Sequence, residues 1–236
     1  RRFVMVDGER SSITVVDQTF SNATTGPADW LDKTFFQIEK PNAIEVIYNG
    51  TDSTNSWKLT KASDVADWKL DGELPEGKEL DTAQAPTSAL SNPAFNDLAN
   101  DAEKVALDKN ATQIKINTSE GFEYVLKVGD STDGSDKIVS VAITANFPEK
   151  RTPAENESAE DKKKLDEEWA AAQKTLQDKL ANEQKFTQHA YRVSSYTVDA
   201  ILKKRSELIK DEEKGAIAPP AGENLPIPFQ NLPPQE

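Results

Sequence analysis

The chain has 236 residues, of which 36% are hydrophobic and 29% charged, enough for one large domain or two small ones. Its 41 acidic residues outnumber its 28 basic ones and give a net charge of −13, which disfavours binding to nucleic acids or anionic lipids. The absence of cysteine excludes a disulfide framework, a thiolate metal site and a cysteine nucleophile.

The first part of the chain, residues 1–102, has the pattern of short strands followed by helix. Its strand patterns alternate apolar and polar side chains or form short apolar runs, and they occupy residues 3–6, 13–16, 43–48, 57–59 and 68–70. Residues 82–102 have a helical composition interrupted by two prolines, which predicts two short helices. We expect Asn92 to cap the second helix and Pro93 to be its first residue.

The same order returns in residues 103–214. Strands are predicted at residues 113–117, 122–128, 137–145 and 189–193. The last strand leads into a predicted helix that begins near Ser195 or Thr197 and ends at Gly215. Strands followed by helix, twice over, predict an α+β fold of two related modules of antiparallel strands, each closed by helix.

A long helix is predicted as an insertion in the second module, over residues 155–185. It begins at the capping box Ser158-Ala-Glu-Asp161 and runs for roughly 25 residues. Its apolar residues recur at steps of three and four, and they are Leu165, Trp169, Ala172, Leu176 and Leu180. The four large residues of this stripe are candidate partner-binding residues. Packing on the chain's own sheet is the favoured alternative, because short loops tether both helix ends near the hairpin.

The two ends of the chain carry separate signals. Residues 215–236 contain six of the 13 prolines, which predicts an extended tail. The chain starts at Arg1-Arg2-Phe3 and has its only methionine at position 5. We therefore expect a trimmed piece of a longer product, from which any membrane anchor or export signal has been removed.

Catalytic and metal-binding patterns are weak in this sequence. His189 is the only histidine, which excludes a multi-histidine metal site, and no Gly-x-Ser-x-Gly sequence accompanies it as a nucleophile elbow. We interpret His189 as an ordinary strand residue. With 41 acidic residues, carboxylate pairs at the spacing of glycosidases arise by chance. We therefore predict no enzyme activity and no catalytic, cofactor-binding or metal-binding residue, with no cofactor.

Two tryptophans offer an alternative function. Trp57 and Trp68, each in a Trp-Lys-Leu strand, would form a ligand platform for a glycan or peptide if they were exposed. The favoured interpretation is that both pack inward with the following leucine, because aromatic residues suit half-buried strands. A glycan- or peptide-binding module is thus the alternative, and a hydrolase that uses scattered carboxylates is a third hypothesis.

Five stretches carry a resemblance to a known family. They are Trp30-Leu-Asp-Lys-Thr-Phe-Phe36, Ile44-Glu-Val-Ile47, Trp68-Lys-Leu70, Tyr124-Val-Leu-Lys-Val-Gly-Asp130 and Tyr191-Arg-Val-Ser-Ser-Tyr-Thr-Val-Asp-Ala-Ile-Leu202. Through them, residue 32 to about residue 214 resembles the bacterial family called domain of unknown function 4340. The helical insertion and the Pro-rich tail depart from the family's common pattern.

The resemblance implies a function, a location and a partner. Members of the family look like single-pass membrane-anchored proteins with an extracytoplasmic domain, often encoded beside ABC-type permeases and gliding-motility-like auxiliary subunits. We therefore expect a non-enzymatic interaction or accessory domain in the bacterial periplasm or cell envelope. The expected partner is a membrane permease or auxiliary subunit, not a nucleic acid. Contact with the membrane is expected only through an anchor that is absent from this chain.

Overall fold

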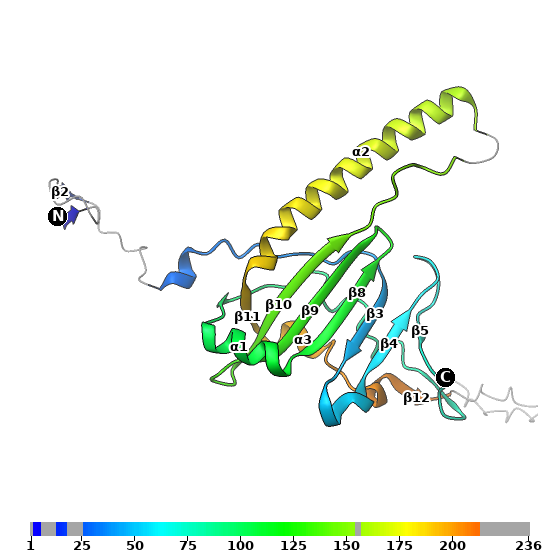
Figure 1. Cartoon of the computed structure of the whole chain (residues 1–236), viewed down its shortest axis with the longest axis horizontal. Coiled ribbons are helices and arrows are strands. Elements are labelled where there is room, and N and C mark those ends of the chain that lie inside the picture. Colours follow the sequence, from blue (N-terminus) through cyan, green and yellow to red (C-terminus); the bar gives the residue numbers. More distant parts are fainter. Residues whose placement is uncertain (1, 6–12, 18–25, 154–156, 213–236) are drawn as a thin grey trace, which may run out of the picture.

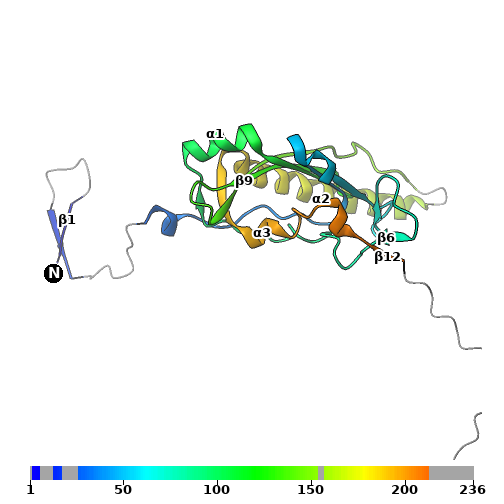
Figure 2. The ribbon, with the colours of Figure 1, turned by 90° about the horizontal axis from the view of Figure 1, so that it is seen from below.

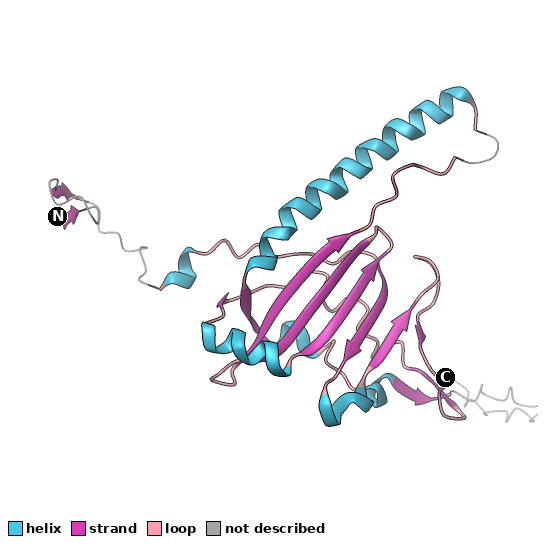
Figure 3. Ribbon diagram, in the orientation of Figure 1, coloured by secondary structure: helices cyan, strands magenta, loops and turns pink. Residues whose placement is uncertain are grey.

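An antiparallel sheet of eight strands forms the body of the molecule in the computed structural model, which describes residues 2–5, 13–17, 26–153 and 157–212 (Figure 1). The strand order is β5-β4-β3-β8-β9-β10-β11-β7. The strands are β3 (Pro41–Ile47), β4 (Trp57–Thr60), β5 (Lys69–Leu70), β7 (Asp97–Leu98), β8 (Thr112–Thr118), β9 (Phe122–Asp130), β10 (Asp136–Ala145) and β11 (Ala190–Ser194). The sheet, together with the helices beside it, confirms the predicted α+β class (Figure 3).

Two smaller strand pairs and several helices complete the described structure. The paired strands are β1 (Arg2–Met5) with β2 (Ile13–Val16), and β6 (Lys78–Leu80) with β12 (Ile209–Asp211). The α-helices are α1 (Asp101–Asn110), α2 (Ala159–Glu183) and α3 (Ser195–Asp199). The 3-10 helices are η1 (Pro27–Trp30), η2 (Gly50–Asn55), η3 (Gln184–Gln188) and η4 (Arg205–Leu208).

Most strand predictions are confirmed. The segments expected at residues 43–48, 57–59, 113–117, 122–128, 137–145 and 189–193 are all strands, with ends shifted by one or two residues. Their side chains alternate between buried and more exposed positions, as in β9, because the main core covers one sheet face and most of the other face is exposed. The N-terminal hairpin is present as β1 and β2, while its turn at Asp7-Gly8 and the tail at residues 215–236 lie outside the described residues.

Strands from both predicted modules lie in the same sheet. β3, from residues 1–102, pairs with β8, from residues 103–214. β7, also from the first segment, pairs with β11 near the other edge of the sheet. The two segments therefore share one sheet, and their division into two modules stays a prediction.

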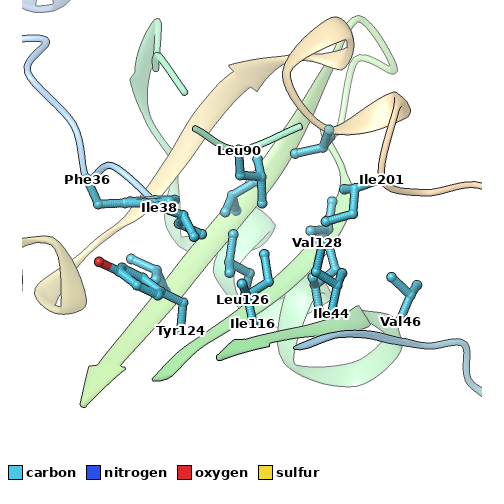
Figure 4. Packing of buried hydrophobic residues seen from close by; sticks show 14 of the residues in the cluster. Phe36, Ile38, Ile44, Val46, Leu90, Ile116, Tyr124, Leu126, Val128 and Ile201 are labelled. Atoms are coloured by element: carbon cyan, nitrogen blue, oxygen red, sulfur yellow. The ribbon is translucent and has the colours of Figure 1, made fainter. Parts of the chain in front are cut away.

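The core lies on one face of this sheet (Figure 4). Side chains such as Ile44, Ile116 and Leu126 rise from the strands, and Phe36 and Leu90 from irregular segments cover them (Figure 4). α1 and α3 lie on opposite sides of the sheet (Figure 2). A smaller apolar cluster on the α1 side includes Leu107 and Ile138. Most of the opposite face carries polar side chains of intermediate or full exposure.

The two helices predicted within residues 82–102 do not form. This segment, which the structure describes completely, consists of turns and β7, and helix α1 begins only at Asp101. Leu90 and Phe95 point into the core at a spacing that one helical face does not provide. Asn92 caps no helix and instead accepts a hydrogen bond from Gln37. Contacts with the sheet have therefore outweighed the helical composition of this segment.

The predicted C-terminal helix is also shorter than expected. α3 ends at Asp199 instead of continuing to Gly215, and the chain goes on to form η4 and β12. The indole N–H of Trp57 donates to the carbonyl of Lys203 at 2.6 Å, and the hydroxyl of Tyr48 donates to the preceding carbonyl. A continued helix would use these carbonyls internally. The two aromatic side chains thus hold the backbone in a non-helical path.

Candidate functional site

The long helix α2 is the most distinctive surface element of the molecule. It has 25 residues, and the side chain of Ser158 accepts a hydrogen bond from the backbone N–H of Asp161, which confirms the predicted start. The helix lies between β10 and β11, which pair with each other from Asp136 opposite Ser194 onward. The predicted insertion in a hairpin is therefore confirmed.

The C-terminal end of α2 is fixed to the sheet by a buried carboxylate. Glu183 is only 7% exposed, and it accepts hydrogen bonds from the hydroxyl of Tyr124 at 2.7 Å and from the backbone N–H of Gln37 at 3.1 Å. Burial and the hydrogen bond to Glu183 raise the pKa of Tyr124 far above its usual range. The hydroxyl therefore stays neutral and remains a donor to the carboxylate.

Further contacts hold the same end of the helix. Leu176 and Leu180 pack against the main core. The ammonium group of Lys179 lies 2.7 Å from a carboxylate oxygen of Glu39 and 5.2 Å from the ring centre of Phe122. Hydrogen bonding and charge from Lys179 lower the pKa of Glu39. The last two turns of α2 are therefore part of the body.

The N-terminal half of α2 extends beyond the ends of the strands (Figure 1). Leu165 is 37% exposed and Trp169 is half-buried, and neither belongs to the described residues that pack on the main core. Ala172 is exposed. The predicted stripe is thus divided: Leu176 and Leu180 pack on the chain's own core, whereas Leu165 and Trp169 lie outside that contact.

An ion-pair cluster braces the extended half of the helix. Arg151, from the segment that follows β10, makes a bidentate pair with Glu157 at 2.5 and 2.6 Å and also bonds Asp166 of α2 at 2.9 Å. The Arg151 and Glu157 side chains are only 15% and 10% exposed. These bonds tie the segment to the helix. We call residues 146–153 together with residues 157–173 the arm.

The structure separates the two candidate ligand-platform tryptophans. Trp57 is 3% exposed, and its indole N–H is bonded to the carbonyl of Lys203. Trp68 is half-buried against the core, with the Lys61 ammonium group 5.3 Å from its ring centre. The pairing of Leu59 with Leu70 places the two indoles at opposite ends of the β4–β5 pair. The tryptophans therefore form no joint aromatic surface.

A second buried carboxylate was missed at the sequence level. Glu103 of α1 has a fully buried side chain, and one of its oxygens accepts hydrogen bonds from Arg192 at 2.8 and 3.2 Å. Arg192 also bonds Asp133 at 2.9 Å. Burial alone would raise the pKa of Glu103, but the bonds from Arg192, Asn100 and Thr132 outweigh burial and lower it. The Asn100-x-x-Glu103 capping box was the available sequence signal.

His189 and the carboxyl groups are the side chains of the described residues to consider for catalysis or metal binding. His189 is exposed and contacts the ring of Tyr191 edge-on, with the ring centres 6.4 Å apart. No group of three or more histidine or carboxylate side chains within the described residues could hold a metal ion. The described carboxyl groups with a clear pKa shift, Asp32, Glu39, Glu103 and Asp133, all have lowered values, whereas a general acid needs a raised one.

A cavity of about 270 Å³ lies between α1 and the neighbouring strands, lined by residues that include Leu107, Gly129 and Lys137. Neither candidate tryptophan contributes to its lining. Lys137 is paired with Asp130 at 2.6 Å, so its charge is already partnered. No helix among the described residues combines the length and apolar character needed to cross a membrane.

The family described as Domain of unknown function (DUF4340) matches residues 1–110 and confirms the family expected from the sequence. The match covers somewhat less than half of the 236-residue chain. The stretches at 124–130 and 191–202, and the arm, lie outside the match. Comparison with curated proteins and with solved structures gave no match.

Proposed function

We propose that the chain is a non-enzymatic interaction domain that binds a protein partner through the arm. The observation that carries this proposal is the division of helix α2: its last two turns are clamped to the body, while its N-terminal half extends beyond the sheet (Figure 1). A helix of this length is only marginally stable in water without packing. The clamp at Glu183 and the Arg151 cluster hold it in place at both ends.

The contact surface of the arm centres on Leu165 and Trp169. These residues continue the stripe that Leu176 and Leu180 already bury against the body. A partner with an apolar surface would extend that packing, and the surrounding charged residues of the helix would set its orientation. Since the arm is braced before binding, little conformational entropy is lost on association.

We also propose a location and a partner class for this interaction. We place the domain on the extracytoplasmic side of a bacterial membrane, anchored by a segment outside this chain, as an accessory to an ABC-type permease or its auxiliary subunit. This assignment follows from what the family resemblance of the sequence implies, and the net charge of −13 argues against a nucleic-acid partner.

The test compares matched variants of the arm in the full-length gene product. Leu165→Glu places a charge on the proposed contact surface, and Ala171→Glu places the same charge at an exposed position of the same helix. We expect Leu165→Glu to abolish co-purification with the permease subunit encoded beside the gene and Ala171→Glu to retain it. Equal binding by both variants would contradict the arm as the contact. A gene neighbourhood without a permease would contradict the partner class.

A further inference from the structure

The N-terminal β1–β2 hairpin exposes an apolar face. Phe3 lies opposite Val15 in the antiparallel register, and the alternation of side chains places Ile13 on the same face. These three side chains are 78%, 50% and 63% exposed, respectively. A two-stranded hairpin is at best marginally stable in water, and an apolar face favours contact with an apolar phase.

The charge of the hairpin segment differs from that of the rest of the chain. Residues 1–17 carry three arginines and three carboxylates, so the whole net charge of −13 belongs to the remaining residues. Three of the six arginines fall within the first ten residues. The hairpin segment is therefore the part that can approach lipid headgroups without the repulsion that the acidic body would meet at an anionic surface.

The size of the apolar face limits what can cover it. Two copies of the hairpin packed face to face would bury only three large described side chains per copy. A stable protein interface buries roughly 1,200–2,000 Å² and about 20–30 residues on each side, so this face is too small for a dimer by itself. A lipid surface has no such minimum size, and one aromatic with two β-branched side chains suits insertion at the headgroup boundary.

We propose that the β1–β2 hairpin binds the surface of an electrically neutral phospholipid bilayer by inserting Phe3, Ile13 and Val15. Apolar insertion holds the contact, and the balanced charge of residues 1–17 permits it. This contact would add a second membrane attachment to the anchor expected outside the chain. It does not depend on the arm, so its test can fail while the proposed protein interaction stands, and the reverse also holds.

The experiment is flotation of the full 236-residue chain with phosphatidylcholine–phosphatidylethanolamine vesicles. Phe3→Ser and Ile13→Ser are each expected to lower the vesicle-bound fraction about tenfold, because each removes most of one inserted apolar side chain. Val65→Ser is the matched control, since Val65 is 97% exposed but lies in the connection between β4 and β5. We expect it to bind like the parent chain.

Salt and lipid charge distinguish apolar insertion from electrostatic adsorption. Binding that persists at high salt and does not increase with anionic lipid supports insertion. Absence of vesicle binding overturns the proposal, as does binding that Phe3→Ser and Ile13→Ser leave unchanged or that Val65→Ser also removes. A monomer–dimer shift caused by Phe3→Ser in sedimentation, without vesicle binding, would assign the face to a second copy and likewise overturn it.

Discussion

The body and the arm use charged residues in different ways. In the body, Glu103 and Glu183 are buried, and each accepts several hydrogen bonds that fix one element onto the sheet. In the arm, the only well-buried described pair is Arg151 with Glu157, and the remaining charged residues of the helix are largely exposed. Burial and satisfied polar groups determine the stability of the body, whereas the arm remains open to a partner. The predictions below test this contrast.

The largest expected effect is a loss of stability that differs between substitutions of the two tryptophans of the body. Trp57→Ala should lower the free energy of unfolding by about 3–5 kcal/mol, because it leaves a cavity under a fully packed indole. Trp68→Ala should lower the free energy of unfolding by less than half of that amount, since the Trp68 ring is only half-buried. Urea denaturation of the two variants measures both values. Similar losses of unfolding free energy for the two variants would show that the exposure of the indole in the folded state does not determine the destabilisation.

The second prediction concerns the buried carboxylate of α1. Arg192→Met should lower the free energy of unfolding by about 3–5 kcal/mol, because it leaves the charge of Glu103 buried without its cation. Lys104→Met is the control: Lys104 pairs with Asp101 at the surface, where such pairs contribute about 0–1 kcal/mol. Equal stability of the two variants in chemical denaturation would contradict the difference between the buried and the surface ion pair.

The same cluster should make stability depend on pH. The pKa of Glu103 is lowered in the folded state from its ordinary value of 4.5, so its contribution is fully present above about pH 4.5. It is lost as the pH falls through the lowered folded pKa, when the carboxylate takes up a proton. Unfolding free energies measured between pH 6 and pH 2.5 should therefore fall more steeply for the parent chain than for Glu103→Gln. Parallel stability curves for the parent chain and Glu103→Gln would exclude Glu103 as a source of the pH dependence.

Much of the sheet and the start of helix α2 were predictable from local patterns. The alternation in residues 122–128 and the N-cap at Ser158 depend on neighbouring residues alone, and both are confirmed. The two helices predicted at residues 82–102 were wrong, and the helix predicted from Ser195 to Gly215 ends at Asp199, because distant side chains decide those paths. Trp57 bonds a carbonyl 146 residues away, a contact that no local pattern contains.

The candidate site shows the same limit. The stripe on α2 was visible as a spacing, but its division into a packed and an extended half depends on where the sheet ends (Figure 1). The hydrogen bond between Tyr124 and Glu183 joins residues 59 positions apart, and the bond of Glu103 to Arg192 spans 89 positions. Sequence alone therefore identified the apolar stripe of helix α2 without identifying the contacts that position it.

The smallest expected effect distinguishes the two halves of helix α2. Leu180→Ala should lower the free energy of unfolding by about 2 kcal/mol, because Leu180 packs against the core. Leu165→Ala should cost less than about 1 kcal/mol, since Leu165 is already 37% exposed and lies outside that contact. Both substitutions replace leucine with alanine within one helix, so helix propensity affects them equally. Thermal denaturation of both variants reports the difference. If Leu165→Ala lowered the free energy of unfolding as much as Leu180→Ala, the arm would be packed as firmly as the body. Its apolar residues would then already be buried by contacts within the chain.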